Sequence, residues 1–307
     1  VVAGVGVPQL TAIMEAAERR EPGLVALIAV TGAIMLASAS EVQGEARYHN
    51  AGFFVLRQLV WLTLAGLACW GASRLDYHRL RWAAVPLVAV TAVLLILCLV
   101  PGVGLKINGS RRWLTAGIAN FQPSELAKIA VIVFLAWWMK RAERRVATLR
   151  DGVLIPFTVL GILLGLIFIE PDYGTTMLIA SVGMAILFLG GTRVGYLALI
   201  ATGGACLFAY AVMREPEHMR RILAFLNPER YAEDEAFQLI QGLYAFVLGG
   251  AGGAGYGQSI QKLHYLPEAH TDFILPIVGE EIGLAGTLGY LLGYVGIFIC
   301  GLLIVLR

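Results

Sequence analysis

Charged residues are scarce in this chain. Asp, Glu, Lys and Arg make up 14% of its 307 residues, whereas soluble globular domains average about 25%. Apolar residues reach 58%, and the mean hydropathy is +0.76. A chain this apolar with so few charges cannot cover itself with a soluble surface, so an ordinary soluble domain is excluded. The apolar residues form long blocks, which predicts an all-α polytopic transmembrane helical bundle.

Cysteines and nucleotide-binding motifs are also few. The four cysteines (Cys69, Cys98, Cys206 and Cys300) lie inside apolar blocks without metal-ligand spacing, so neither a disulfide framework nor a zinc site is expected. Gly250, Gly252 and Gly255 satisfy G-x-G-x-x-G, but they do not follow a strand in a βαβ unit. There is no P-loop either, and we expect no nucleotide or nucleic-acid ligand.

Windows of about 19 residues predict eight membrane-spanning helices. Basic residues cluster in the N-terminal segment and after the second, fourth and sixth spans. By the positive-inside rule, the N-terminus is expected in the cytoplasm. The predicted spans are residues 23–40, 53–73, 83–101, 124–139, 153–170, 174–190, 194–213 and 277–306.

This pattern predicts a simple domain organisation. Residues 1–22 form a cytoplasmic N-terminal segment, and residues 23–307 form a single transmembrane domain. The connection over residues 214–276 is then a large outer loop. Within it, Phe237 to Leu248 is apolar enough for a short helix, and the glycine-rich stretch from Gly249 to Gly257 is flexible or tightly turning.

The outer connection before the fourth span is rich in ionisable residues. Arg111 and Arg112 either anchor at lipid headgroups or bind a diphosphate, for which the guanidinium fork is well suited. Pro123 is expected to begin the span, with Ser124 as its cap. Glu125 and Lys128 then lie three residues apart on one helical face. They are either a structural ion pair or part of a functional site, because ionisable residues in membrane spans are costly.

Two further outer segments carry charge. Asp172, in Glu170-Pro-Asp-Tyr-Gly-Thr-Thr, either caps the sixth span or contributes to a polar cavity. Arg220 and Arg221 open the large loop, either as a solvated pair or as a clamp for lipid phosphate.

Asp272 is the strongest catalytic candidate. It lies where the polar loop re-enters the apolar phase, so its carboxylate is partly desolvated and suited to act as a general base. The alternative is an N-cap for the last helix. The same loop delivers Lys262 and His270 as substrate-binding candidates. A metal held by His264, His270 and Asp272 is the less favoured alternative. Glu280 and Glu281 are expected to face the same cavity or to pair with arginines.

Taken together, these segments resemble the SEDS family (shape, elongation, division and sporulation), and five separated blocks occur in the family's order. The segment from Gln258 to His270 is closer to the division branch than to the elongation branch. The blocks are Asn108-Gly-Ser-Arg-Arg-Trp113, Phe121-Gln-Pro-Ser-Glu-Leu-Ala-Lys128, Glu170-Pro-Asp-Tyr-Gly-Thr175, Arg221-Ile-Leu-Ala-Phe-Leu-Asn-Pro228 and Leu266-Pro-Glu-Ala-His-Thr-Asp-Phe-Ile274 with Gly279-Glu-Glu-Ile-Gly283.

The resemblance implies a peptidoglycan glycosyltransferase of the bacterial cytoplasmic (inner) membrane. Such enzymes polymerise lipid II into β-1,4 glycan at the outer face during cell division, with a class B penicillin-binding transpeptidase (FtsI-like) and other divisome membrane proteins as partners. The resemblance implies Asp272 as the essential residue. It also implies a cavity bordered by Arg111, Arg112 and Trp113, floored by Glu125 and Lys128, and contacted by Arg220 and Arg221 at the diphosphate.

The resemblance also leaves some expectations open. Family members usually have ten spans, so we expect this chain to lack the last two. Pro276 stands where the family commonly has a small residue, which puts the placement of Glu280 and Glu281 in question. A divalent cation (Mg or Mn) is an optional cofactor. The rival interpretations are a lipid II flippase or polyprenyl-lipid transporter, and a non-catalytic scaffold for division enzymes.

Overall fold

A computed structural model describes residues 7–107, 110–115, 120–214, 216–263 and 265–305 of the chain. Its secondary structure is almost entirely helical and contains long apolar helices, so the predicted helical membrane bundle is confirmed. The chain divides into two compact units. Residues 72–211 form one, and residues 1–71 together with 212–307 form the other.

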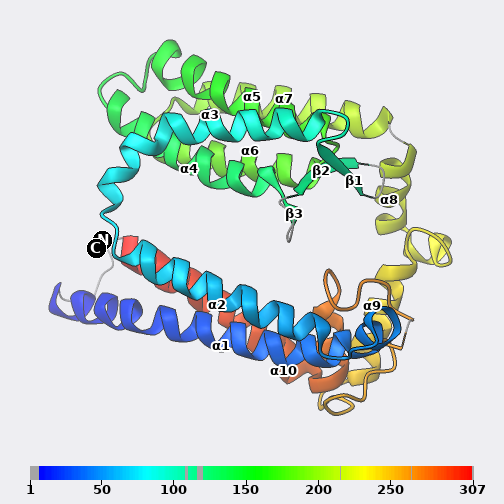
Figure 1. Ribbon diagram of the computed structural model, residues 1–307. Helices are drawn as coiled ribbons and strands as arrows, with labels where there is room; N and C mark the ends of the chain where they lie inside the picture. Colours follow the sequence, from blue (N-terminus) through cyan, green and yellow to red (C-terminus); the bar gives the residue numbers. More distant parts are fainter. Residues whose placement is uncertain (1–6, 108–109, 116–119, 215, 264, 306–307) are drawn as a thin grey trace. The chain divides into compact units, whose positions relative to one another are not determined.

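The unit of residues 72–211 is built around a buried apolar core. Leu95, Phe134, Leu163 and Ile179 lie in this core, and each comes from a different helix. The polar ends of these helices therefore lie at the rims of the unit. Its helices (Figure 1) are η1 (Tyr77–Arg79), α3 (Leu80–Leu99), α4 (Pro123–Ala142), the π-helical η2 (Arg150–Leu154), α5 (Ile155–Ile169), α6 (Tyr173–Leu189) and α7 (Val194–Arg214).

A three-stranded antiparallel sheet joins α3 to α4, and the sequence analysis did not predict it. In the order β1-β2-β3, Leu105 pairs with Trp113, and Leu114 pairs with Phe121. Successive side chains on a strand point to opposite faces, so the neighbouring Arg111 and Arg112 are directed differently. The strands are β1 (Gly104–Ile107), β2 (Ser110–Thr115) and β3 (Asn120–Phe121).

The other unit packs its first and last helices against each other. Met35 and Ala39 lie on one of these helices and Ile277 and Val278 on the other, and all four are buried in one cluster with Leu266. In Figure 1 the first helix runs beside the last. The helices are α1 (Val7–Tyr48), α2 (Phe53–Ser73), α8 (Pro216–Leu226), η3 (Pro228–Tyr231), α9 (Phe237–Gly249) and α10 (Ile274–Val305).

Helices occupy all eight positions predicted as spans, but the count of eight spans is not confirmed. Six of the described helices are long and apolar enough to cross a membrane. The other two are α6, which has 17 residues, and α4, which carries Glu125, Lys128, Lys140 and Arg141.

Some helix predictions in this unit were incomplete. The helix α1 begins at Val7 instead of residue 23, because the charged residues before the apolar block are good helix formers and extend the helix. The amphipathic helix α8 was missed, whereas the predicted short helix near Phe237 is α9.

Candidate functional site

Asp272 lies in the turn that directly precedes α10. The residue is exposed, and its carboxylate makes no hydrogen bond or ion pair with any residue that the structure describes. An N-cap carboxylate would accept a backbone N–H of the first helical turn. The described contacts therefore give no support to the capping alternative and leave the carboxylate able to contact a ligand.

The turn that carries Asp272 is held by its neighbours. The carbonyl oxygen of Glu268 accepts hydrogen bonds from the backbone N–H groups of Thr271 and Phe273, each at 3.2 Å. Leu266 and Ala269, upstream in the same segment, are buried in the core cluster of this unit. The Asp272 carboxylate is thus exposed on a segment whose backbone is fixed.

His270 lies two residues before Asp272 and packs on an aromatic ring. The ring centroids of His270 and Phe54 are 4.6 Å apart, and the imidazole Nδ1 is buried without a partner in the described part of the chain. Burial lowers the pKa of His270, although the nearby Glu268 and Asp272 oppose this effect. The neutral imidazole can therefore donate or accept a hydrogen bond beside Asp272.

The described residues contain no group of three or more His, Cys, Asp or Glu side chains that could hold a metal ion. His264, which completed the metal alternative, lies outside the described residues. Among the described residues, Asp272 is therefore a single carboxylate without further protein ligands, and these residues alone do not fit an Mg or Mn site.

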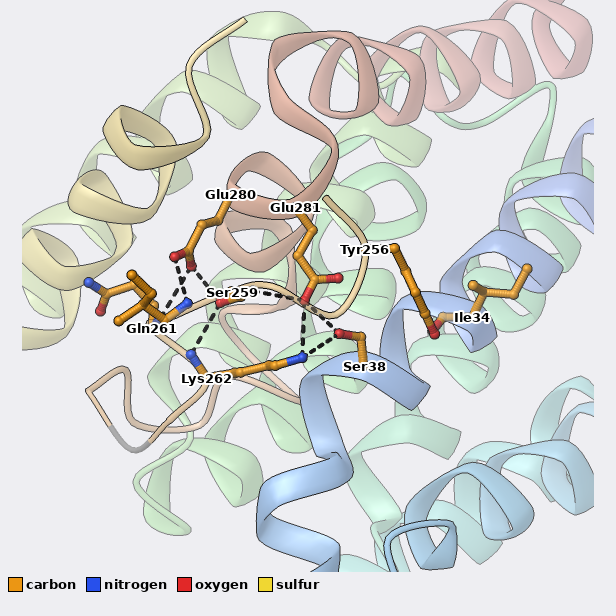
Figure 2. Close-up of polar contacts among 9 residues, drawn as sticks. Ile34, Ser38, Tyr256, Ser259, Gln261, Lys262, Glu280 and Glu281 are labelled. Atoms are coloured by element: carbon orange, nitrogen blue, oxygen red, sulfur yellow. Dashed lines mark hydrogen bonds and ion pairs between the residues drawn. The ribbon is translucent and has the colours of Figure 1, made fainter. Parts of the chain in front are cut away.

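Lys262 belongs to a buried polar network (Figure 2). Its Nζ lies 3.3 Å from Glu281 Oε1 and donates a 2.9 Å hydrogen bond to Ser38 Oγ of α1. The Lys262 and Glu281 side chains are 4% and 0% exposed. Because the ammonium is enclosed and already bonded, the described contacts give no support to the prediction that Lys262 contacts substrate.

Among the described residues, Glu280 and Glu281 form no pair with an arginine, which was one of the two alternatives for them. Glu281 is bonded to Lys262 and Ser38. Glu280 accepts hydrogen bonds from the Ser259 hydroxyl and from the backbone N–H groups of Ile260 and Gln261. Both carboxylates therefore fasten the loop before Asp272 to α10.

The helix α10 is interrupted at Gly283, whose φ of 78° and ψ of −163° are not helical. The glycine-rich loop satisfies the backbone groups around this break. Ala254 N donates to Glu280 O at 2.8 Å, and Leu284 N donates to Gly250 O at 3.0 Å. Broken membrane helices are tolerated where other parts of the protein satisfy the freed backbone groups. The glycine-rich stretch is therefore a tight packing element.

In the unit of residues 72–211, the two neighbouring arginines have different roles. Arg112 donates from Nε to the carbonyl oxygen of Glu170 at 3.1 Å, and it also donates to the carbonyl oxygen of Pro171. It therefore braces β2 against the turn between α5 and α6. Arg111 instead lines a cavity of about 340 Å³ together with Lys106 and Ser110. Of the pair, Arg111 is the better placed for an anionic group, and the half-buried Trp113 follows on the same strand.

The start of α4 brings the remaining predicted residues of this unit together. Lys128 Nζ lies 2.6 Å from Glu125 Oε2, so these side chains form an ion pair that is still partly exposed. Pro123 begins the helix as predicted, but Ser124 is not its cap. The N-cap is Gln122, whose Nε2 donates to Ser124 Oγ at 2.9 Å and to Asp172 Oδ2 at 3.3 Å.

Asp172 caps α6, which was one of the two alternatives for it. Its Oδ1 accepts a hydrogen bond from Thr175 N at 3.2 Å, and the residue is buried. In the other unit, both Arg220 and Arg221 are exposed, and Arg220 forms an ion pair with Glu235 at 3.2 Å. The structure thus brings Glu125, Lys128 and Asp172 to one rim of their unit.

Glu170 is a titratable residue that the sequence analysis did not single out. It is 1% exposed, and neither carboxyl oxygen has a partner among the described residues. Burial, together with the neighbouring Asp172, raises the pKa of Glu170 from about 4.5 to about 7 despite the opposing charge of Arg112. Near neutral pH, this acid therefore holds a proton for much of the time.

We expect Glu170 to make stability fall as pH rises. The pKa of Glu170 is higher in the folded than in the unfolded chain. Its contribution to the free energy of unfolding is therefore fully present below pH 4.5 and is lost as the pH rises through about 7. The full loss is about 3 kcal/mol. Glu170→Gln should remove this loss, giving a higher Tm than wild type at pH 8 and little gain at pH 4.5. Thermal unfolding in detergent at the two pH values measures this difference in Tm. The control is Glu143→Gln, because Glu143 is exposed. An equal effect of Glu170→Gln at both pH values would contradict the assignment.

A family of cell cycle proteins that groups FtsW, RodA and SpoVE matches the chain over residues 20–307. The chain belongs to this family. A protein of Trichlorobacter lovleyi named "Probable peptidoglycan glycosyltransferase FtsW" is 39% identical over 86% of this chain and 70% of its own length. A protein of Coxiella burnetii with the same name is 38% identical over 83% of this chain and 68% of its own length.

Two solved structures share the fold. A structure described as "Structural coordination of polymerization and crosslinking by a peptidoglycan synthase complex" has a TM-score of 0.67 and 30% identity, covering 89% of this chain and 74% of the other. The crystal structure of the rod shape determining protein RodA of Thermus thermophilus has a TM-score of 0.61 and 24% identity, covering 90% and 71%.

Proposed function

We propose that the chain is a peptidoglycan glycosyltransferase that polymerises lipid II at the outer face of the bacterial cytoplasmic membrane during cell division. The names of its relatives support the activity and the division branch. The observation that carries the catalytic assignment is the exposed carboxylate of Asp272, which is unbonded within the described chain and lies at the start of a membrane helix. In this proposal the N-terminus lies in the cytoplasm and Asp272 lies outside.

The proposed reaction is a single displacement. The Asp272 carboxylate takes the proton of the 4-hydroxyl of N-acetylglucosamine on the acceptor lipid II. That oxygen forms a bond to C1 of N-acetylmuramic acid at the reducing end of the growing chain. The bond from C1 to the diphosphate breaks, and polyprenyl diphosphate leaves. Attack opposite the leaving group inverts C1, which gives the β-1,4 linkage.

The leaving diphosphate requires cationic partners. Arg111 and Lys106 line the cavity described above, and Lys128 lies on the rim of the same unit. Arg221 is exposed in the other unit. Guanidinium groups bind diphosphate oxygens in a bidentate manner and stabilise charge that develops on them. We assign diphosphate binding to Lys106, Arg111 and Lys128 of the unit of residues 72–211, and we assign Arg112 the role of holding the strand that carries Arg111. Arg221 of the other unit is a separate candidate for a lipid phosphate. No step is assigned to a divalent cation.

A class B penicillin-binding transpeptidase is the proposed partner. The similar peptidoglycan synthase complex coordinates polymerisation with crosslinking, and a polymerase that supplies strands to a crosslinking enzyme fits that arrangement. We therefore expect activity to be measured best with the transpeptidase present and its own active site blocked by a β-lactam.

The experiment that tests the function separates polymerisation from transport. The purified chain and the blocked transpeptidase are placed in liposomes with fluorescent lipid II. We expect polymer that muramidase degrades to form from lipid II accessible at the outer face. Movement of lipid II across the bilayer without glycan would support the flippase instead. A scaffold would give neither product.

A further inference from the structure

The Lys262–Glu281 ion pair is buried in the unit that contains Asp272, and the proposed reaction does not use it. The two side chains are 4% and 0% exposed, and Nζ lies 3.3 Å from Oε1. Enclosing two charges is costly, and removing one partner leaves the other buried without compensation. Because a buried ion pair often adds little to the free energy of unfolding, the presence of this pair calls for another role.

The pair connects the loop before Asp272 to α10, which follows it closely in the sequence, and to α1, which lies more than 200 residues earlier. Ser38 of α1 donates to Glu281 Oε1 at 2.6 Å and accepts from Lys262 Nζ at 2.9 Å. Figure 2 shows Lys262 reaching from the loop toward Glu281 on α10 and Ser38 on α1. The network thereby fixes the loop against both helices.

A second carboxylate fastens the same loop. Glu280 accepts from Ile260 N at 2.8 Å and from Gln261 N at 3.3 Å, so the backbone just before Lys262 is held as well. Glu280 itself is 1% exposed. Residues 260–262 of the loop are therefore bound to α10 through the side chains of two consecutive residues, Glu280 and Glu281.

The Lys262–Glu281 ion pair joins residues on either side of Asp272 in the sequence. Lys262 precedes the catalytic candidate and Glu281 follows it, so the pair closes a loop around Asp272. Inside that loop, Leu266 and Ala269 are buried in the same cluster as Ile277 of α10. The position of the exposed carboxylate relative to α10 thus depends on contacts that are themselves fully buried.

We propose that Lys262 and Glu281 are positioning residues, which hold the loop so that Asp272 is presented at a fixed place beside α10. This inference rests on the proposed function. A displacement of about 1 Å at a reacting group can lower a rate by a factor of about 100. The pair would therefore affect the catalytic step more than substrate binding.

The first test is Lys262→Met, with Lys140→Met as a matched control. Lys140 forms an ion pair with Glu143 at the same 3.3 Å, but both side chains are largely exposed. We expect Lys262→Met to lower kcat for lipid II polymerisation about tenfold with KM changed less than twofold. We expect Lys140→Met to change neither value. A raised KM with an unchanged kcat would mean that Lys262 contacts substrate, and would overturn the proposal.

The double variant Lys262→Met/Glu281→Gln separates positioning from stability. Removing both charges avoids leaving a lone buried carboxylate, so we expect its Tm to return toward wild type. We expect kcat to remain at least fivefold below wild type, because the contacts of Lys262 with Glu281 and Ser38 are lost and only Glu280 still holds the loop to α10. If kcat recovers together with Tm, the pair is only structural and the proposal fails.

Amide hydrogen exchange tests the positioning role without relying on glycan formation. We expect the amides of residues 259–273 to exchange faster in Lys262→Met than in wild type, with unchanged exchange in α3 to α6. If wild type makes no glycan, the proposed function fails, whereas the exchange measurement still decides whether the pair holds the loop. Unchanged exchange in residues 259–273 would overturn the positioning role whatever the activity.

Discussion

Asp272→Asn is expected to lower lipid II polymerisation at least about 100-fold, because a general base contributes a factor of about 100 to 10,000. Asparagine preserves the size of the side chain but cannot accept the proton of the sugar hydroxyl. Asp272 makes no bond to the described residues, so its loss should not weaken the fold. The measurement is the initial rate of glycan formation, with Tm recorded for each variant.

Asp234→Asn is the matched control for this prediction. Asp234 is another exposed aspartate of the loop between α7 and α10, and its backbone carbonyl, not its carboxylate, accepts from Phe237 N. We expect this variant to polymerise at the wild-type rate. A native rate for Asp272→Asn, or a loss that only follows a lowered Tm, would rule out Asp272 as the base.

Gly253→Ala is expected to have the largest effect on stability. Gly253 has φ of 76°, a region that costs residues with a Cβ about 1–2 kcal/mol. A Cβ built there would lie 2.3 Å from the carbonyl oxygen of Glu281, so the loop would have to move away from the break in α10. We expect a loss of about 3 kcal/mol or more, measured by thermal unfolding in detergent.

Gly252→Ala, one residue earlier, is the control. A Cβ at Gly252 would meet nothing within 4 Å, and the residue has no positive φ. We expect its Tm to stay within a few degrees of wild type. Equal destabilisation by the two variants would contradict this prediction, because it would show that the close approach of Gly253 to α10 is not the cause of the loss.

The helical positions could be predicted because each depends on a long apolar block that only a bilayer can accommodate. The charged ends of α1 escaped this criterion, because helix propensity extended the helix beyond the apolar residues. The short sheet formed by β1, β2 and β3 was missed because its strands are two to six residues long and carry little periodicity.

The candidate site was predictable to a similar degree. The place of Asp272 directly before the last helix was predicted, but its carboxylate was expected to be partly desolvated, whereas the structure leaves it exposed. Sequence position alone does not determine how much of a turn its neighbours cover. The different roles of Arg111 and Arg112 depend on strand alternation, so they could be recognised only once β2 was known. The burial of Lys262 could not be predicted, because its partners, Ser38 and Glu281, are 224 and 19 residues away, and a buried lysine gives no local signal.

The most direct test of the proposed chemistry uses lipid II whose N-acetylglucosamine 4-hydroxyl is capped. Such a molecule can lose its diphosphate but offers no proton for Asp272 to take. We predict that the chain, with its blocked transpeptidase partner, makes glycan from uncapped lipid II and none from capped lipid II alone. Polymer from the capped substrate, or no polymer from the uncapped one, would contradict the account.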